Sequence, residues 1–236
     1  MTVEEYRARV EKAKRIVFFG GAGVSTESGI PDFRSVDGLY NQKYDEPPEE
    51  ILSAHYFYAH TEKFYKFYFD KMICTSAKPN AAHLKLAEWE KAGKLSAVVT
   101  QNIDGLHQAA GSKKVFELHG STLRNFCTRC GKYHSLEDIL KTAPNVPKCE
   151  CGGLIKPDVV LYGEGLPEEA VDGALDEIAH ADMLIVGGTS LTVYPAAGFI
   201  RFYRGAPENL ILINKTPIDG FTNQLNGKIG EILSGG

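Results

Sequence analysis

The sequence predicts an α/β fold in which a doubly wound parallel sheet carries a small inserted domain. Three observations lead to this prediction. Short runs of β-branched and apolar residues recur along the chain, helical stretches lie between several of them, and two regions, 36–75 and 124–156, interrupt the alternation. Because alternating strands and helices form parallel sheets with helices on both faces, the repeating part of the chain should form the larger domain.

Five runs have the length and composition of parallel strands that are buried on both faces. They are Ile16–Phe19, Leu95–Val99, Val115–Leu118, Met183–Val186 and Leu210–Ile213. Between the first two runs, Pro79 and Asn80 predict the start of a helix that continues to Lys91 and ends before Gly93.

The two interrupting regions differ in composition. The first is rich in aromatic residues, as in HYFYAHTEKFYKFYF, which indicates helices packed on an aromatic interface, and the second contains four cysteines with Pro144 and Pro147. We therefore predict a Rossmann-like domain, a small domain in two parts, and a cleft between the domains. The Rossmann-like domain comprises residues 1–35, 76–123 and 157–236, and the small domain has a helical part, 36–75, and a cysteine-containing part, 124–156.

Composition and charge exclude several classes of protein. The 236 residues include 26 basic and 30 acidic side chains, so the net charge of -4 gives no reason to expect a nucleic acid or an anionic membrane as partner. No segment approaches the roughly 20 apolar residues that span a bilayer, and the first residues are charged and helical rather than a signal peptide. A cytoplasmic protein is therefore expected. In such a protein, four cysteines between Cys127 and Cys151 indicate metal binding rather than disulfides.

Glycines and polar residues follow each predicted strand, at the edge where open parallel sheets bind ligands. These segments are Gly20–Gly23, Gln101–Asp104, His119–Gly120, Gly187–Ser190 and Asn214–Lys215. The first continues as GGAGVSTESG, which suits a phosphate loop because glycines let the backbone approach and a following helix N-terminus would offer free N–H groups. A tight strand-to-helix turn explains the same glycines equally well, so this segment alone leaves both interpretations open.

Seven features, in order along nearly the whole chain, together resemble the sirtuin family. They are GAGVSTESGIPDFRS (21–35), TQNIDGLHQAAG (100–111), ELHG (117–120), the paired cysteines, KPDVVLYGE (156–164), GGTSLTVYPAA (187–197) and INK (213–215). The resemblance implies an NAD-dependent protein-lysine deacetylase of the bacterial type. NAD would be its co-substrate, one structural Zn²⁺ would bind per chain, and acetylated-lysine proteins or peptides would be its partners.

The resemblance also implies which residues bind NAD. Around the phosphates it places Gly21, Ala22, Gly23 and Thr26, and as a mobile cover that gates nicotinamide loss it places Asp32, Phe33 and Arg34. The residues that correspond to the nicotinamide and ribose site are Gln101, Asn102, Ile103 and Asp104. Those that correspond to the adenosine end are Gly188, Thr189, Ser190, Asn214, Lys215 and Ile229.

Two residues correspond to the catalytic positions of the family, His119 as general base and Asn102. In the family's chemistry the acyl-lysine carbonyl oxygen displaces nicotinamide, and a ribose hydroxyl must then lose its proton. A group that titrates near neutrality suits this step. The alternative is a histidine that merely caps a turn after a strand.

The residues implied to bind the substrate peptide follow KPD. They are Val160, Leu161, Gly163 and Glu164. This stretch is expected to pair with the peptide by β-augmentation, while the acyl-lysine enters an apolar tunnel. An ordinary buried strand in VVLY is equally compatible with the composition.

The cysteine pairs have the spacing of a structural zinc site. Cys127-x-x-Cys130 and Cys149-x-Cys151 flank 18 residues, and four thiolates so arranged close a tetrahedral site with no open position. The second pair has one spacer residue where many sirtuins have two, but residues i and i+2 of an extended segment project to the same side. His134 is an alternative ligand, and Cys74 is expected to be a lone thiol that is at least partly buried.

The aromatic region bears on the acyl group. Sirtuins that prefer succinyl or malonyl lysine resemble one another in a Tyr-x-x-Arg motif, whereas the comparable stretch here reads Tyr65-Lys-Phe-Tyr68. Without that arginine a buried acyl carboxylate would lack its bidentate partner, so acetyl or another neutral acyl group is expected. Lys66 and Lys71 are the alternative partners for a carboxylate.

Other functions stay in view: deacylation of longer neutral acyl groups, mono-ADP-ribosyl transfer, hydride transfer on the same fold, and binding by a zinc ribbon. Hydride transfer is disfavoured because Thr26 stands where the pattern G-x-G-x-x-G needs its third glycine. A nucleic-acid module would need a basic face, and the scattered cations near the cysteines are more typical of a solvated surface. These cations are Arg124, Arg129, Lys132, Lys148 and Lys156.

Overall fold

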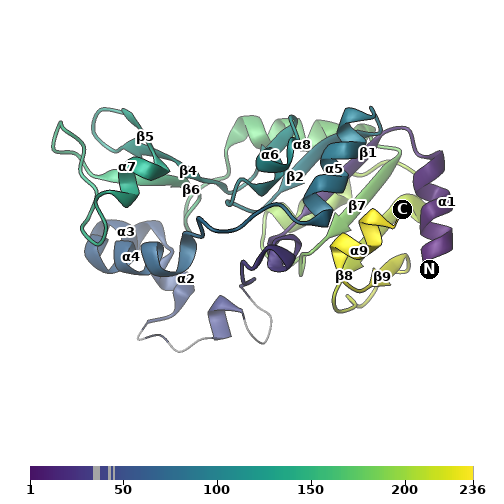
Figure 1. Ribbon diagram of the computed structural model, residues 1–236, viewed down its shortest axis with the longest axis horizontal. Helices are drawn as coiled ribbons and strands as arrows, with labels where there is room; N and C mark the ends of the chain where they lie inside the picture. The colour runs from purple at the N-terminus through teal and green to yellow at the C-terminus, as the bar shows by residue number, and fades with distance from the viewer. Residues whose placement is uncertain (34–37, 42–43, 45, 236) are drawn as a thin grey trace.

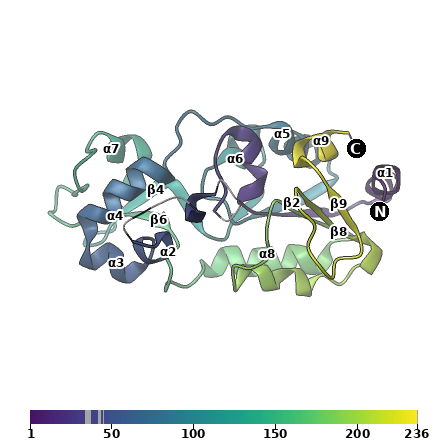
Figure 2. The ribbon, with the colours of Figure 1, turned by 90° about the horizontal axis from the view of Figure 1, so that it is seen from below.

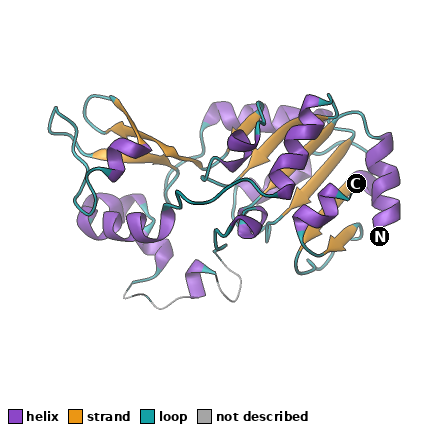
Figure 3. Cartoon of the chain, viewed as in Figure 1, coloured by secondary structure: helices purple, strands orange, loops and turns teal. Residues whose placement is uncertain are grey.

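The computed structural model describes residues 1–33, 38–41, 44 and 46–235. The chain forms two lobes side by side, with both termini at the far end of the larger lobe (Figure 1). The larger lobe is built on six parallel strands, and the smaller one on three antiparallel strands with short helices (Figure 3). The predicted fold class, a doubly wound parallel sheet with a small additional domain, is confirmed.

The larger sheet has the strand order β3-β2-β1-β7-β8-β9, and every neighbouring pair is parallel. Its strands are β1 (Ile16–Gly20), β2 (Leu95–Thr100), β3 (Val115–Glu117), β7 (Met183–Gly187), β8 (Leu210–Asn214) and β9 (Gln224–Asn226). Five of them are the predicted runs, each changed by one residue at its end. Strand β9 is not predicted from the sequence, because this edge strand of three residues contains no apolar run.

Helices cover both faces of this sheet, with α8 and the 3₁₀ helix Ala196–Phe202 on one side and α5, α6 and α9 on the other (Figure 2). Side chains of β1 alternate between the two faces, so Phe18 packs in the cluster of α5 and α9, while Val17 and Phe19 pack in that of α8. The helices of this lobe are α1 (Val3–Lys12), α5 (Ala81–Lys91), α6 (Leu106–Ala110), α8 (Glu168–His180) and α9 (Ile229–Ser234).

Helix α5 begins and ends as its sequence predicts. Asn80 caps the first turn by accepting the N–H of Ala82 at 2.9 Å, and its own N–H donates to the Nδ1 atom of His83. Beyond Lys91 the chain leaves the helix through Gly93, whose φ is +73°.

The smaller lobe combines short helices with an antiparallel sheet. Its sheet has the order β5-β4-β6, and both pairs are antiparallel. One buried cluster joins the aromatic helices to this sheet, and within it the hydroxyl of Tyr65 donates to the carbonyl oxygen of Ile155. The elements are α2 (Pro48–Ile51), α3 (Ala54–Ala59), α4 (Thr61–Phe67), a π-helical turn (Tyr68–Met72), β4 (Gly120–Cys127), β5 (Tyr133–Ser135), α7 (Leu136–Leu140) and β6 (Ile155–Val159).

Short 3₁₀ helices complete the structure. They are Ala22–Val24, Thr26–Ser28, Leu39–Asn41, Ala196–Phe202 and Pro207–Asn209. Among the residues that the structure describes, no helix combines the length and the apolar character needed to cross a bilayer.

Candidate active site and metal centre

The carboxyl ends of the parallel strands meet at the edge of the larger sheet that faces the small lobe. The chain passes from β3 through His119 directly into β4, which places this edge against the smaller lobe. Gly20, Thr100 and Gly187, the last residues of β1, β2 and β7, lie in register. The segments that follow these strands, which are predicted to bind ligand, therefore begin side by side at the same edge of the sheet.

The loop after β1 packs directly on the loop after β7. The N–H groups of Gly21 and Gly23 donate to the carbonyl oxygens of Gly187 (3.1 Å) and Gly188 (2.8 Å). Gly188 has a φ of +61°, and a methyl group on it would overlap the backbone of the first loop. Among the described residues, the amide of Ala22 donates to no acceptor, so it is available to an anionic ligand.

The first loop does not lead into an α-helix, so the expected helix N-terminus is wrong. Two 3₁₀ turns follow β1, and the second ends at Gly29, whose φ of +85° turns the chain away. Thr26, at the start of the second turn, is exposed, and its hydroxyl donates to the carbonyl oxygen of Gly23 at 2.9 Å. Any anion here must be bound by loop amides rather than by a helix dipole.

Ser25 is the centre of a buried polar cluster. Its hydroxyl donates to a carboxylate oxygen of Asp104 (2.6 Å) and accepts a hydrogen bond from the side-chain amide of Asn102 (3.0 Å). The other carboxylate oxygen of Asp104 accepts the N–H of Leu106 at 2.9 Å. Asn102 and Asp104 are therefore held in fixed orientations. The sequence analysis missed Ser25, because only the fold shows that it is 1% exposed and lies between these two side chains.

His119 lies against the backbone of the 101–104 segment. Its Nδ1 atom is 3.0 Å from the carbonyl oxygen of Gln101, and since a carbonyl oxygen can only accept, Nδ1 holds the proton and Nε2 keeps a lone pair. Burial lowers the pKa of His119 below 6.5, and the hydrogen bond to Gln101 opposes part of this effect. The imidazole is therefore neutral at pH 7, the form that accepts a proton.

Gln101 connects His119 to the other strand ends. Its N–H donates to the carbonyl oxygen of Gly20 at 2.9 Å, and its side-chain amide donates to the hydroxyl of Thr189 at 3.3 Å. Thr189 and Asn214 are joined by two hydrogen bonds, of 3.1 Å and 2.8 Å, between backbone and side-chain amide. The predicted residues after β1, β2, β3, β7 and β8 thus belong to one connected set.

Other predicted residues lie around this set. Ser190 and Lys215 are exposed beside Thr189 and Asn214. Ile229, the first residue of α9, is 4% exposed and packs against Gly187, so it belongs to the core beneath the edge.

The predicted cover connects the two lobes. Asp32 and Phe33 are half-buried, and their carbonyl oxygens accept the N–H groups of Leu39 and Tyr40, both at 2.8 Å. Phe33 and Ile103 both pack against the buried cluster of the small lobe. Arg34, the third predicted residue of the cover, lies outside the described residues.

The stretch predicted to bind peptide begins where β6 ends. The N–H of Val160 donates to the carbonyl oxygen of His119 at 3.0 Å, so this stretch touches the imidazole-bearing loop. Leu161 is buried in the small-lobe cluster, and Gly163 is exposed with a φ of +91°. The carboxylate of Glu164 accepts hydrogen bonds from the N–H of Leu161 (2.9 Å) and from Lys156 (3.0 Å). VVLY is therefore not one continuous buried strand.

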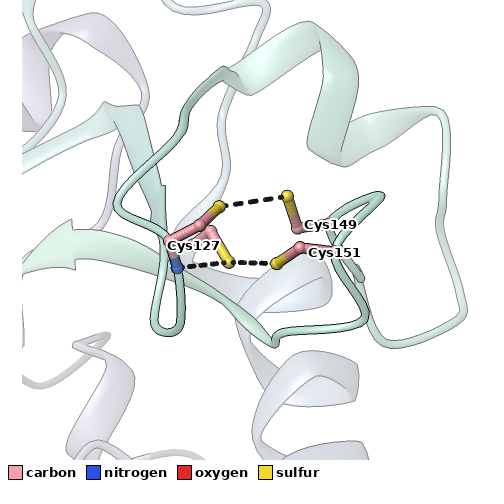
Figure 4. Close-up of side chains that lie close together, drawn as sticks. Cys127, Cys149 and Cys151 are labelled. Atoms are coloured by element: carbon pink, nitrogen blue, oxygen red, sulfur yellow. Dashed lines mark hydrogen bonds between the residues drawn. The ribbon is translucent and has the colours of Figure 1, made fainter.

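The four predicted cysteines converge in the small lobe. Figure 4 shows the sulfurs of Cys127, Cys149 and Cys151 pointing toward one another. All four ligand atoms lie within 4.8 Å of one another, with Cys127–Cys151 at 3.4 Å and Cys130–Cys149 at 3.8 Å. A tetrahedral zinc with Zn–S bonds of about 2.3 Å needs sulfurs about 3.8 Å apart. The site therefore fits Zn²⁺.

Backbone amides support the thiolate form of Cys127. Its sulfur accepts hydrogen bonds from the N–H groups of Cys130 (3.5 Å) and Arg129 (3.4 Å), and together with hydrogen bonds from the thiols of Cys151 and Cys130 these lower the pKa of Cys127 to about 6. His134 is not part of the group of ligand atoms. Cys74 is exposed, so the expectation that it is at least partly buried is wrong, because it lies in the loop that follows the aromatic helices.

The opposite edge of the larger sheet contains a hollow of about 310 Å³ at the amino ends of β1, β7 and β8. Several of its polar groups are already paired. Arg9 donates to Asn223 at 3.3 Å and to a backbone carbonyl, and the carboxylate of Asp182 accepts the N–H groups of Lys14 and Arg15. The carboxyl edge remains the candidate site.

Comparison with known proteins identifies relatives that match almost the whole chain. The sequence model of the Sir2 family matches residues 21–195. An NAD-dependent protein deacetylase of Clostridium acetobutylicum is 54% identical over 238 aligned residues, covering 98% of this chain and 96% of the relative. An NAD-dependent protein deacetylase of Thermotoga maritima is 41% identical over 225 residues, covering 93% and 90%.

Solved structures agree. A structure of Sir2 with a p53 peptide and NAD⁺ aligns with a TM-score of 0.85 and 40% identity, covering 99% of this chain and 96% of that chain. A Sir2 variant with deacetylated p53 peptide and 3′-O-acetyl ADP-ribose aligns with a TM-score of 0.88 and 40% identity, over the same shares of both chains.

Proposed function

We propose, since the chain belongs to the Sir2 family, that it is an NAD-dependent protein-lysine deacetylase. Its products are the deacetylated lysine, nicotinamide and O-acetyl-ADP-ribose. Relatives that match over almost the whole chain are NAD-dependent protein deacetylases, and related Sir2 structures contain NAD⁺ or acetyl ADP-ribose with a peptide. The observation that carries the proposal is the neutral imidazole of His119, fixed by Gln101 among the polar strand ends.

The residues at these strand ends fit NAD, the co-substrate. The free amide of Ala22 suits a pyrophosphate oxygen, and the close packing of the loops at Gly23 and Gly188 leaves no room for side chains there. We assign the nicotinamide and ribose to 101–104, whose Asn102 and Asp104 are oriented by Ser25, and the adenosine end to the segments around Thr189 and Asn214. When bound, NAD supplies a ribose carbon whose bond to nicotinamide can break.

His119 acts as the general base in this proposal. Gln101 holds the proton on Nδ1, so Nε2 is the nitrogen that takes a proton from a ribose hydroxyl. The lowered pKa keeps this nitrogen unprotonated at neutral pH. Asn102 contributes by orientation rather than by proton transfer, because its side-chain amide is neither an acid nor a base near neutrality.

The substrate is an acetylated-lysine protein or peptide, bound along 160–164. Val160 is tied to the carbonyl oxygen of His119, so a peptide paired with this stretch lies beside the base. The carboxylate of Glu164 accepts hydrogen bonds from the N–H of Leu161 and from Lys156, and these hold the turn at the end of this stretch. We therefore assign Glu164 a supporting role in peptide binding.

The zinc ion has a structural role in this proposal. Four thiolates fill a tetrahedral shell and leave no position for substrate or water. We also propose that 36–75 and 124–156 act as one small domain, since a single buried cluster contains side chains of both, including Cys127 and Cys149. Loss of zinc would then disturb the whole lobe.

We propose no nucleic acid and no membrane as partners. Of the cations near the cysteines, Lys132 pairs with Glu150, Lys156 with Glu164, and Arg124 with Glu117 and Asp158. We keep a cytoplasmic location as part of the proposal, and cell fractionation tests it.

The proposal is tested by incubating the protein with NAD and an acetyl-lysine peptide and measuring products by mass spectrometry. Deacetylated peptide, nicotinamide and O-acetyl-ADP-ribose should appear in equal amounts. Transfer of ADP-ribose onto protein without deacetylation would favour a mono-ADP-ribosyltransferase, and an absorbance increase from NADH would favour a dehydrogenase. The remaining alternative is a deacylase that prefers longer neutral acyl groups. Comparing the turnover of acetyl peptides with that of peptides carrying longer neutral acyl groups, in the same assay, tests this alternative.

A further inference from the structure

Strand β4 separates from β6 just after His119. Gly120 and Ser121 pair with Val159 and Asp158, and pairing then resumes only at Asn125, opposite Pro157. Residues 122–124 therefore form an irregularity of the bulge type. Such irregularities redirect side chains and backbone groups toward other elements.

The first residue of this bulge binds the 101–104 segment. The N–H and the hydroxyl of Thr122 both donate to the carbonyl oxygen of Ile103, at 2.9 Å and 3.0 Å. The bulge is thus attached to the segment that carries Asn102 and Asp104.

The last residue of the bulge, Arg124, joins two carboxylates from different strands. Its Nε atom donates to Asp158 at 2.8 Å, and one of its Nη atoms donates to Glu117 at 2.6 Å. The side chain of Glu117 is only 10% exposed, and its carboxylate is paired with Arg124. We call this pair of contacts the Arg124 bridge.

The two carboxylates of the Arg124 bridge lie close in sequence to the contact between the base and the peptide-binding stretch. Glu117 stands two residues before His119, and Asp158 stands two residues before Val160. The two segments are joined directly, because the N–H of Val160 donates to the carbonyl oxygen of His119 at 3.0 Å. The two backbones are so close here that a methyl group on Gly120 would overlap the carbonyl oxygen of Asp158.

We propose that Arg124 is a positioning residue, which fixes the distance between His119 and the peptide-binding stretch by bridging Glu117 and Asp158. This inference rests on the proposed function, since it assigns the base to His119 and the peptide to 160–164. Arg124 itself reaches no reacting atom. Its effect is to keep two segments in register, because loss of its charge would leave the carboxylates on either side of the bulge without their shared cation.

Two variants test the Arg124 bridge. Arg124→Met keeps a stem of similar length but donates to neither carboxylate, and Arg124→Lys keeps the charge but cannot span both in the same planar geometry. Arg15→Met is the matched control, because Arg15 also bridges to a buried carboxylate, that of Glu177, at 2.9 Å on the opposite edge of the sheet.

Hydrogen exchange of the Val160 amide gives a readout that needs no substrate. In Arg124→Met, this amide should exchange at least about tenfold faster than in the wild type, as expected for loss of a charge-assisted hydrogen bond that supports it. Deacetylation kcat should fall at least about tenfold and the peptide KM should rise, with the NAD Kd and zinc content unchanged. Arg124→Lys should give a smaller loss in the same direction, and Arg15→Met should match the wild type in all five measurements.

Wild-type exchange at Val160 and wild-type kcat in Arg124→Met would overturn the inference. If Arg124→Met does not fold, wild-type values in Arg124→Lys would overturn it equally. A wild-type protein that makes no nicotinamide from NAD and acetyl peptide would contradict the proposed function instead, and the exchange at Val160 would still decide whether the bridge holds the two segments together.

Discussion

The Nδ1 atom of His119 lies 3.0 Å from the carbonyl oxygen of Gln101, a residue whose own N–H and side chain are bound to Gly20 and Thr189. The imidazole is therefore attached to a backbone that ties together the ends of three strands. Its orientation and its proton are set by the sheet rather than by a flexible loop, which is the arrangement that a general base requires.

The pH dependence of the reaction should reflect the lowered pKa of His119. Burial disfavours the charged imidazole, so the neutral, active form persists below pH 6.5. The value of kcat/KM should rise as the pH increases through the pKa of the free enzyme, and the midpoint of this acid limb should lie below pH 6.5. A pH profile measured with an acetyl peptide checks this, and an acid limb centred above 6.5 would contradict it.

Zinc should leave when one thiolate is removed. Cys130→Ser should lose about one zinc per chain, because three sulfurs bind the ion far less tightly, and the small lobe should become less stable. Metal analysis and thermal unfolding measure both effects. Cys74→Ser is the matched control, since Cys74 is exposed and outside the cluster, and it should keep its zinc. Wild-type protein purified without zinc would count against the site.

Acetyl-lysine should be preferred over succinyl-lysine. Tyr65 and Tyr68 are buried in the small-lobe cluster, whereas Lys66 is exposed and Lys71 pairs with Asp70 at 3.0 Å. Neither lysine is available to a buried acyl carboxylate, which would be desolvated without compensation. Turnover of a succinyl peptide should be at least about tenfold slower than that of the same peptide with an acetyl group. Faster succinyl turnover would refute this preference.

Two buried histidines should make the protein sensitive to acid. His83 and His107 lie with ring centroids 4.7 Å apart, and burial lowers their pKa values to about 4 and about 3, with the charge of Asp104 opposing part of the shift for His83. Between these values and 6.5 the unfolded chain binds more protons than the folded one, so stability falls as the pH decreases. The loss should be on the order of 3 kcal/mol per histidine by pH 4.

This sensitivity is measured by urea unfolding at several pH values. His107→Phe keeps an aromatic ring but cannot be protonated, so its free energy of unfolding should change less between pH 6.5 and pH 4. His55→Phe, a change at an exposed histidine on α3, is the matched control because it removes a histidine outside this buried pair. Equal slopes in all three proteins would show that the buried histidines do not titrate in this way.

Much of the larger lobe could be predicted because its signals are local. Runs such as Ile16–Phe19 and Met183–Val186 are buried on both faces, so their composition alone identifies them, and Asn80 caps its helix by contacts within four residues. The edge strand Gln224–Asn226 has no such signal, because it is held by pairing with β8 rather than by burial. The 3₁₀ turns after β1 were likewise not predicted, since the loop is set by its packing on Gly188.

The candidate site also has residues that local sequence patterns predict and residues that only the fold brings together. The order of the motifs predicts which residues gather at the carboxyl edge, and the spacing of the cysteines predicts the metal centre. The role of Ser25 depends on contacts with Asn102 and Asp104, which lie about 80 residues further along the chain, and no local pattern reports such contacts. The predicted domain limits at 123 and 157 fall inside β4 and β6. These two strands pair across about 30 residues of sequence, so no local pattern reports their ends. The division of the chain into two domains stays a prediction.

The most direct test of the account compares wild type with His119→Ala in the presence of NAD and an acetyl-lysine peptide. The variant should bind NAD with an unchanged Kd and keep its zinc, while formation of O-acetyl-ADP-ribose falls by about 10² to 10⁴, the range expected for loss of a general base. His55→Ala, at an exposed position on α3, is the control. Near-normal formation of O-acetyl-ADP-ribose by His119→Ala would contradict the assignment of the base.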